Sequence, residues 1–291
     1  MDVESFEWQK TLILVYAWLF VCQVTAAVES PTVTVQRNIE YASVDNISLK
    51  ADVYQTPSER TDRPAILMVH GGAWMSGDKV HVVRHAREMA GRGYVVVAIN
   101  YRLAPRHPFP CQLEDCQAGL QWMHQQREKL GIDSERIAGY GYSAGGHLVC
   151  LLATQNKSAL DGSSDDDSSV PRLCAVVAGG APCEFRKMET NDETLAFWLG
   201  GTRQTHADVY EQASPVAFAS ADDPPVFFFH GELDRVVPKS SAWALHQALS
   251  QAGVVTSFRV VKQAGHLKAN LASEIFAEVA EFLDSHTAVR P

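Results

Sequence analysis

The sequence lacks any run rich in lysine and arginine, and its 34 acidic residues outnumber its 25 basic ones. Its formal net charge is −9. A nucleic-acid partner needs positive side chains to neutralise its phosphates, so this composition argues against one. The same charge disfavours docking on anionic membranes. Hydrophobic residues make up 46% of the chain and charged residues 20%, which is ordinary for a protein that buries a substantial core.

Metal-binding patterns, internal repeats and long linkers are also missing. No cysteine or histidine spacing resembles a zinc site, so we predict no metal. The acidic segment 161–169 (DGSSDDDSS) lacks the spacing and closing glutamate of a calcium loop, which predicts a solvated surface loop. With no linker long enough to divide the chain, we expect residues 28–291 to form a single domain.

The longest apolar run stands near the N-terminus. Residues 11–27 carry no charge and end in Thr25-Ala26-Ala27, small residues that suit a signal peptidase. We therefore predict a signal peptide at 1–27 and a secreted or periplasmic protein, for which no stable membrane partner is expected. The residues before the run carry three acids, Asp2, Glu4 and Glu7, against one base, Lys10, which leaves open a membrane anchor through residues 11–27 or a misassigned start.

Cysteine is sparse. Outside the leader there are five cysteines, so one mature chain can form at most two disulfides. The pairs Cys111–Cys116 and Cys174–Cys183 are close enough in sequence to bridge after export. Buried or half-buried free thiols fit the sequence as well.

Apolar runs of strand length alternate with segments of helical length along the rest of the chain. A β-hairpin is predicted at 33–54, with its turn at Asp45-Asn46. Further strands are predicted at 65–70, 94–100, 136–142, 173–178, 225–230 and 257–262. Helices are predicted up to about residue 92 and at 112–130, 144–154, 240–251 and 268–285. This alternation predicts an α/β fold with a mostly parallel central sheet.

The motif G-x-S-x-G at Gly141–Gly145 (GYSAG) follows a predicted strand and opens a predicted helix. A nucleophile elbow requires that setting, because the sharp turn holds its serine in strained backbone and exposes the hydroxyl. We therefore predict Ser143 as a catalytic nucleophile. A second loop, His70-Gly71-Gly72-Ala73-Trp74, follows another buried strand and suits an oxyanion hole. Its donors would be Gly71 or Gly72, with Ala73 as a further candidate, together with Ala144.

A serine nucleophile needs a base that is itself oriented by an acid. The strand at 225–230 runs into a turn that holds Asp234, our predicted acid, with Glu232 as the local rival. His266 lies between the last strand and the last helix and is the predicted base. All these segments follow strand ends, which meet at one edge of a parallel sheet.

These motifs carry a family resemblance. From about residue 38 to 286 the chain resembles the α/β-hydrolase superfamily, and within it the carboxylesterase and acetyl-esterase group related to hormone-sensitive lipase and bacterial feruloyl or acetyl esterases. The matching stretches are HGGAWMSGDK, NYRLAPRHPFP, GYSAGGHL, HGELDRVVP and AGH. The resemblance implies an α/β-hydrolase fold with a small cap or none. It also implies ester hydrolysis through an acyl-enzyme, with Ser143, Asp234 and His266 as the triad and no cofactor.

The expected substrates are short-chain acyl esters, with acetyl or feruloyl groups on polysaccharides among them. An amidase or arylformamidase would use the same triad, and a binding module on a hydrolase fold would use none of it.

Trp74 either lines the substrate pocket or packs beneath it. Arg102 and Asp115 are expected to form a buried structural pair, and 227–229 to be strand core. His70 is expected to orient its loop, and the histidines outside these motifs to be exposed: His81, His85, His107, His124, His206, His246 and His286.

Overall fold

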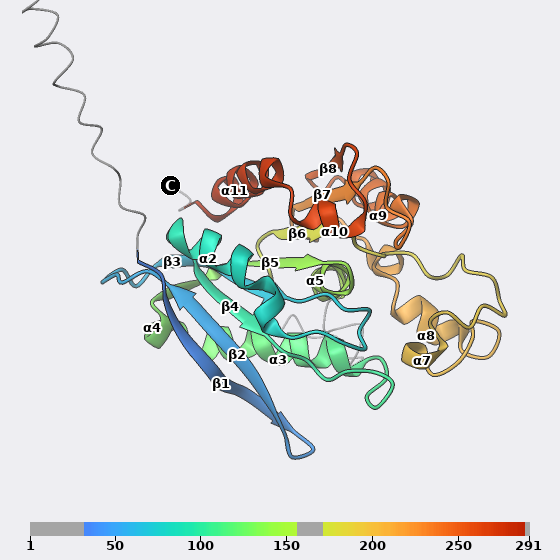
Figure 1. Cartoon of the computed structure of the whole chain (residues 1–291), viewed down its shortest axis with the longest axis horizontal. Helices are drawn as coiled ribbons and strands as arrows, with labels where there is room; N and C mark the ends of the chain where they lie inside the picture. Colours follow the sequence, from blue (N-terminus) through green and yellow to red (C-terminus); the bar gives the residue numbers. More distant parts are fainter. Residues whose placement is uncertain (1–31, 156–170, 289–291) are drawn as a thin grey trace, which may run out of the picture. The chain divides into compact units, whose positions relative to one another are not determined.

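The computed structural model describes residues 32–155 and 171–288, so the predicted leader at 1–27 and the acidic segment 161–169 lie outside the described residues. One eight-stranded sheet has the order β1-β2-β4-β3-β5-β6-β7-β8 (Figure 1). Strand β2 pairs antiparallel with β1 and β4, and every other neighbouring pair is parallel. The mostly parallel sheet is therefore confirmed.

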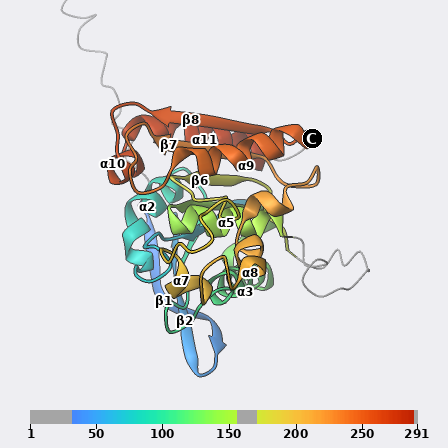
Figure 2. The same cartoon turned by 90° about the vertical axis from the view of Figure 1, so that its right-hand side faces the viewer.

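The strands follow the predicted apolar runs closely. Their bounds are β1 Thr34–Val44, β2 Ile47–Gln55, β3 Arg63–Val69, β4 Val95–Ile99, β5 Ile132–Tyr142, β6 Val176–Gly179, β7 Val226–Gly231 and β8 Thr256–Val261. The predicted hairpin is β1 and β2, whose turn uses left-handed backbone at Asp45 and Asn46. Figures 1 and 2 show this hairpin at one end of the sheet and β7 and β8 at the other.

Helices cover both faces of the sheet. Helices α3 (Cys111–Gln125), α5 (Ala144–Thr154) and α9 (Lys239–Gln251) bury apolar side chains in one core. Helices α2 (Val83–Gly91) and α11 (Ser273–Thr287) do so on the opposite face. Successive side chains of a strand point to opposite faces. Leu67 of β3 accordingly packs in the first core and Ile66 in the second.

The predicted long helices are interrupted in two places. The predicted helix 268–285 is two helices, α10 (His266–Asn270) and α11, because Ala272 has extended backbone between them. The predicted helix 112–130 is likewise α3 followed by α4 (Arg127–Leu130). Each shorter piece presents its own apolar face to the sheet.

Three short helices lie outside the predicted pattern, and a fourth begins the helical stretch predicted up to about residue 92. Between β6 and β7 stand α7 (Ala196–Leu199), α8 (Ala207–Gln212) and the 3₁₀ helix η2 (Pro215–Phe218). The 3₁₀ helix η1 (Lys79–Val82) leads into α2. In Figure 1, α7 and α8 lie together beyond the end of α5. They belong to residues 180–225, the connection between β6 and β7.

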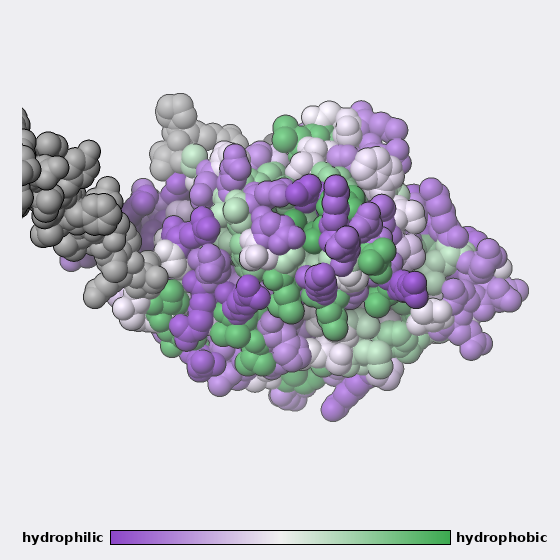
Figure 3. Space-filling view, turned by 45° about the horizontal axis from the view of Figure 1, so that its top comes forward, coloured by the Kyte–Doolittle hydropathy of each residue, from purple (hydrophilic) through white to green (hydrophobic). Residues whose placement is uncertain are grey.

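The face drawn in Figure 3 carries mostly hydrophilic side chains with small apolar groups between them. Some large apolar side chains are exposed beside the predicted acid and base, namely Leu233, Val236 and Leu267. Among the described residues, no helix has the length and apolarity that crossing a membrane requires.

Candidate active site

Ser143 stands at a sharp turn between the end of β5 and the start of α5. Its backbone angles are φ 56° and ψ −123°, a conformation that few non-glycine residues adopt. The turn is held by Ser143 N–H, which donates to the Gly179 carbonyl at 2.8 Å, and by His147 N–H, which donates to the Ser143 carbonyl at 2.9 Å. The predicted strand-to-helix elbow is therefore present, with its serine partly exposed.

The turn needs glycine at position 145. A Cβ built there would lie 2.1 Å from the Val69 carbonyl oxygen and 2.7 Å from that of His70, which is far closer than van der Waals contact. The first turn of α5 therefore packs directly on the end of β3. This contact brings the elbow against the loop that follows β3.

His266 and Asp234 lie together beside this edge of the sheet. His266 Nδ1 is 2.7 Å from Asp234 Oδ2, and the carboxylate is 1% exposed. Burial opposes its charge, but N–H groups of Val237 and Val236 donate to Oδ1, and His266 faces Oδ2. These contacts hold the pKa of Asp234 below its ordinary value. The carboxylate therefore stays ionised next to the imidazole.

Glu232, the rival acid, has a different partner. Its side chain is exposed and accepts a hydrogen bond from Gln263 N–H at 2.8 Å. It thus closes the turn next to His266, whereas Asp234 contacts the imidazole.

The 70–74 loop lies directly against the elbow. A Cβ at Gly71 would be 2.8 Å from the Tyr142 carbonyl oxygen and 3.3 Å from Ser143 Cβ. Gly72, Ala73 and Trp74 all have positive φ, so the loop turns sharply. Within the described part of the chain, the N–H groups of Gly71, Gly72 and Ala73 donate to no acceptor. The predicted role of these groups as oxyanion donors stays a prediction.

His70 packs against the rest of the 70–74 loop inside the protein. Its ring is 1% exposed and stacks on Tyr101 with centroids 4.2 Å apart. Its Nδ1 lies 2.8 Å from the Gly71 carbonyl oxygen. Burial lowers the pKa of His70 to about 4, so the ring is neutral at pH 7. These contacts suit the orienting role expected of it.

Trp74 packs inside the protein. The residue is 4% exposed, and its ring stacks on Trp198 of α7 with centroids 3.7 Å apart. Its Nε1–H donates to Nδ1 of His147 at 3.1 Å. Of the two roles left open by the sequence, packing beneath the site fits this geometry.

His147 and Trp198 are site-supporting residues that sequence reasoning missed. His147 is fully buried in α5, and its Nε2 lies 2.7 Å from the Ala213 carbonyl oxygen. Trp198 donates through Nε1–H to Gln112 at 3.0 Å. These contacts tie the 70–74 loop, α5 and the segment between β6 and β7 together. His147 could have been noticed because it lies inside the matching stretch GYSAGGHL. Trp198 lies in no motif, so nothing in the sequence indicated its role.

The other side chains considered in the sequence have structural roles. Arg102 donates through Nε to Asp115 at 2.9 Å, and both are buried, as expected of a structural pair. The three phenylalanines at 227–229 are buried in β7. His85, expected to be exposed, is 2% exposed because α2 turns it under α11 against Phe276.

No disulfide joins the candidate cysteine pairs. Cys111 and Cys116 are both free thiols on α3. Cys183 is a free thiol as well, so it does not bridge to Cys174. In the described ranges no group of three or more histidine, cysteine or carboxylate side chains is placed to hold a metal ion. The expected absence of metals and cofactors stays a prediction.

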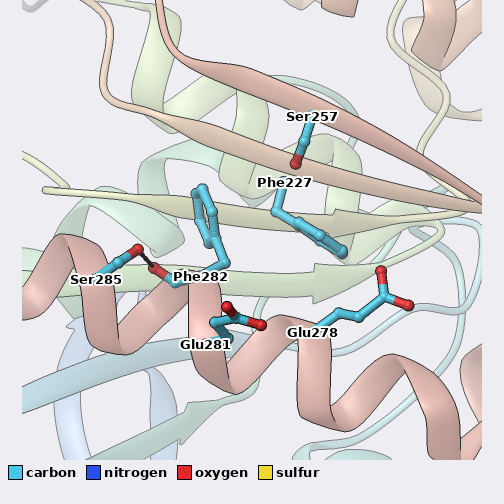
Figure 4. Close-up of a pocket in the computed structure, with 6 residues that line it drawn as sticks. All are labelled: Phe227, Ser257, Glu278, Glu281, Phe282 and Ser285. Atoms are coloured by element: carbon cyan, nitrogen blue, oxygen red, sulfur yellow. Dashed lines mark hydrogen bonds between the residues drawn. The ribbon is translucent and has the colours of Figure 1, made fainter.

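A hollow of about 300 Å³ lies elsewhere, between α11 and the start of β7 and β8 (Figure 4). It is lined by Phe227, Ser257, Glu278, Glu281, Phe282 and Ser285. These strand residues stand at the amino-terminal ends of β7 and β8, whereas Asp234 follows the carboxyl end of β7. The hollow is therefore separate from the Asp234–His266 pair.

The sheet order, the elbow and the paired acid and base define an α/β-hydrolase fold with a serine-hydrolase arrangement of side chains. A family model described as BD-FAE matches residues 51–249. The match covers more than half of the sequence, so the chain belongs to the BD-FAE family.

Named esterases are similar to it in sequence. An arylesterase of Saccharolobus solfataricus is 35% identical over 226 residues, which are 75% of this chain and 72% of that protein. Esterase LipQ of Mycobacterium tuberculosis is 29% identical over 80% of this chain. The chain spans 58% of the length of LipQ and 45% of that of the probable carboxylic ester hydrolase LipM from the same organism.

Solved structures share the fold. A truncated carbohydrate esterase from gut microbiota has a TM-score of 0.77 at 24% identity, covering 90% of this chain and 99% of its own. Esterase 2 of Thermogutta terrifontis, phosphonylated by sarin, has a TM-score of 0.74 at 27% identity, covering 90% of this chain and 98% of its own.

Proposed function

We propose that this protein is a carboxylic ester hydrolase that acts through an acyl-enzyme on Ser143. The observation that carries the proposal is the 2.7 Å contact between His266 Nδ1 and Asp234 Oδ2, at the same sheet edge as the strained Ser143 turn. Support also comes from the esterases among its relatives and from the tabun and sarin adducts of Thermogutta terrifontis esterase 2.

In the proposed mechanism, His266 Nε2 takes the hydroxyl proton of Ser143 as Oγ attacks the ester carbonyl carbon. Asp234 holds the proton on Nδ1 and stabilises the imidazolium that forms. The tetrahedral oxyanion is held by Ala144 N–H and by N–H groups of Gly71 or Gly72, each worth about 3 kcal/mol of transition-state stabilisation.

When the intermediate collapses, the imidazolium protonates the leaving alcohol and the acyl group remains on Ser143. His266 then removes a proton from water, which attacks the acyl carbon. Release of the acid restores the Ser143 hydroxyl. No cofactor takes part in these steps.

The proposed substrates are esters of short acyl chains. The supporting observation is that Thermogutta terrifontis esterase 2, a protein of the same fold, has propionate-bound and butyrate-bound structures. Acetyl or feruloyl groups on polysaccharides belong to this class of ester. The gut carbohydrate esterase shares the fold. A panel from acetyl to palmitoyl p-nitrophenyl esters tests the proposal, and a preference for long chains would contradict it.

The first test is hydrolysis of p-nitrophenyl acetate by the wild type and by Ser143→Ala. Wild-type turnover is expected, with a loss of several orders of magnitude in the variant and no change in folding. A fluorophosphonate probe should add one adduct, which tryptic mass spectrometry places on Ser143. Methyl ferulate and an N-formyl aryl amide are run beside it. Cleavage of the formamide alone would instead indicate an arylformamidase, and no turnover at all a binding module.

For localisation, we propose export directed by residues 1–27. The supporting observation is the uncharged run at 11–27 followed by small residues. Expression of the full chain in a secreting host should yield a soluble product whose N-terminus lies near residue 28. A product that keeps the run and sediments with membranes would support the anchor instead.

A further inference from the structure

The carboxylate of Asp234 has a second histidine beside it, and the proposed mechanism does not use that histidine. Oδ2 lies 2.7 Å from His266 Nδ1 and 3.2 Å from Nε2 of His230. Oδ1 accepts the N–H groups of Val236 and Val237 at 2.9 and 3.0 Å. His230 is 0% exposed and is the second-last residue of β7, four residues before Asp234.

The contacts of His230 fix where its proton is. Nε2 lies 3.0 Å from the Val237 carbonyl oxygen and 3.2 Å from Asp234 Oδ2. Both of these atoms are acceptors, so Nε2 must carry the hydrogen. The other ring nitrogen, Nδ1, is buried and has no hydrogen-bond partner within the described residues. A second proton on Nδ1 would have no acceptor, so the ring is neutral.

The charges around His230 agree with a neutral ring. Burial is the largest effect and opposes its charged form, as do His266 and Lys239, whereas the Val237 carbonyl and Asp234 favour that form. The pKa of His230 is therefore below its ordinary value. His230 is thus a constant N–H donor across the pH range in which histidine bases work.

A packing role alone does not account for this residue. The ring lies against Phe258, with centroids 6.4 Å apart and planes 13° from parallel, which an apolar side chain would do as well. A buried acceptor without a hydrogen-bond partner, such as Nδ1, is destabilising. A residue that carries such a cost is explained by what its other nitrogen contacts.

We propose that His230 is a positioning residue that fixes the Asp234 carboxylate for His266. Its Nε2–H donates to the Val237 carbonyl, and Val237 N–H in turn donates to Asp234 Oδ1. Both the carbonyl and the N–H of Val237 are therefore held in place. The same N–H lies next to Oδ2, which keeps this oxygen directed at His266 Nδ1. No proton passes through His230, and no bond to substrate forms there. This inference rests on the proposed function.

The test compares variants that remove the donor with one that keeps it. His230→Leu and His230→Met lack the N–H, whereas His230→Gln carries an amide N–H at similar reach. With p-nitrophenyl acetate, both donor-free variants should lose roughly 10- to 100-fold in kcat, because misaligned catalytic groups cost about that much. KM should stay within about twofold, and His230→Gln should recover most of the loss.

A spectroscopic readout does not need turnover. In the wild type, the His266 Nδ1–H proton facing Asp234 should give a far-downfield NMR resonance. The resonance should persist in His230→Gln and move upfield or broaden in the donor-free variants, while near-ultraviolet circular dichroism stays that of the wild type. This readout also separates the two proposals, because it reports on His230 even where Ser143-dependent turnover fails.

Three results would overturn the proposal. One is wild-type kcat and an unchanged resonance in both donor-free variants. Another is an equal loss in all three variants, which would show that the imidazole itself matters rather than its donor. The third is failure of both donor-free variants to fold while His230→Gln folds, which would make the residue structural.

Discussion

At the scale of single residues, the site depends on side chains that hold other side chains. Tyr142, the residue before the nucleophile, donates its hydroxyl hydrogen to the main-chain carbonyl of His266. Its ring centroid lies 5.1 Å from that of the imidazole. The elbow therefore positions the base as well as the nucleophile.

This contact predicts a specific effect of Tyr142→Phe. Without the hydroxyl, the first turn of α10 loses its link to β5, so the imidazole has more freedom relative to Ser143. We expect kcat for p-nitrophenyl acetate to fall about 3- to 10-fold with little change in KM, since a lost hydrogen bond is worth about 1 kcal/mol.

Tyr94→Phe is the matched control. Tyr94 donates its hydroxyl hydrogen to Asp284 of α11 at 2.7 Å, away from Ser143. This variant should lose stability and keep kcat. Similar kcat in the two variants would show that the Tyr142 hydroxyl has no part in placing the base.

At the scale of elements, the decisive contact is the one between α5 and β3. The main chain of α5 at Gly145 lies directly against the main chain of β3 at Val69, which leaves no space for a side chain. Gly145→Ala should therefore lower the free energy of unfolding by about 3 kcal/mol or more, because the backbone of β3 must shift. Urea denaturation followed by circular dichroism measures this.

Gly91→Ala makes the same substitution where there is room. Gly91 is the last residue of α2, and a Cβ there would have no neighbour within 4 Å. Alanine is the better helix former by about 0.5–1 kcal/mol, so this variant should be slightly more stable. If Gly145→Ala were as stable as Gly91→Ala, the packing of α5 on β3 would be looser than described.

Sequence reasoning succeeded at element scale wherever a segment carried its own signal. The central strands β3, β4, β6 and β7 are short apolar runs. Ser143, Asp234 and His266 each follow a predicted strand, so their places in the fold were readable. Helices α7 and α8 are too short to show a period. The break at Ala272 depends on how α10 and α11 dock, which no local pattern records.

The supporting residues were harder to predict because their partners are distant in sequence. Trp74 is buried by Trp198, which comes from the segment between β6 and β7. His147 needs both Trp74 and the Ala213 carbonyl to define its state. The sequence indicates only that His230 lies at the end of an apolar strand. Its contact with Asp234 becomes visible in the structure, where the following turn places the two side chains together.

At the scale of the whole molecule, buried neutral histidines make stability depend on pH. Burial lowers the pKa of His147 from 6.5 to about 4 in the folded protein. The unfolded chain therefore takes up a proton as pH falls from 6.5 toward 4, while the folded chain does not. His70 behaves in the same way. Stability that is fully present above pH 6.5 is thus lost through this window.

We expect His147→Gln to weaken that dependence. Glutamine can accept from Trp74 and donate to Ala213, but it does not titrate. Between pH 5 and 6.5 the slope of unfolding free energy against pH should fall by up to about 1.4 kcal/mol per pH unit. Urea titrations at several pH values measure the slope, with surface His81→Gln as the control. An unchanged slope would mean that His147 is protonated in the folded protein.

The order of the site's parts along the chain has a consequence in time. The 70–74 loop and Ser143 are synthesised early, whereas His266 follows β8, which is the last strand along the chain and stands at the edge of the sheet. A ribosome that adds about 5–20 residues per second needs on the order of ten seconds to go from Ser143 to His266. If the proposed mechanism holds, the nascent chain has its nucleophile but not its base throughout that interval. On that mechanism, reactivity toward esters begins only after β8 and the turn that carries His266 have been made.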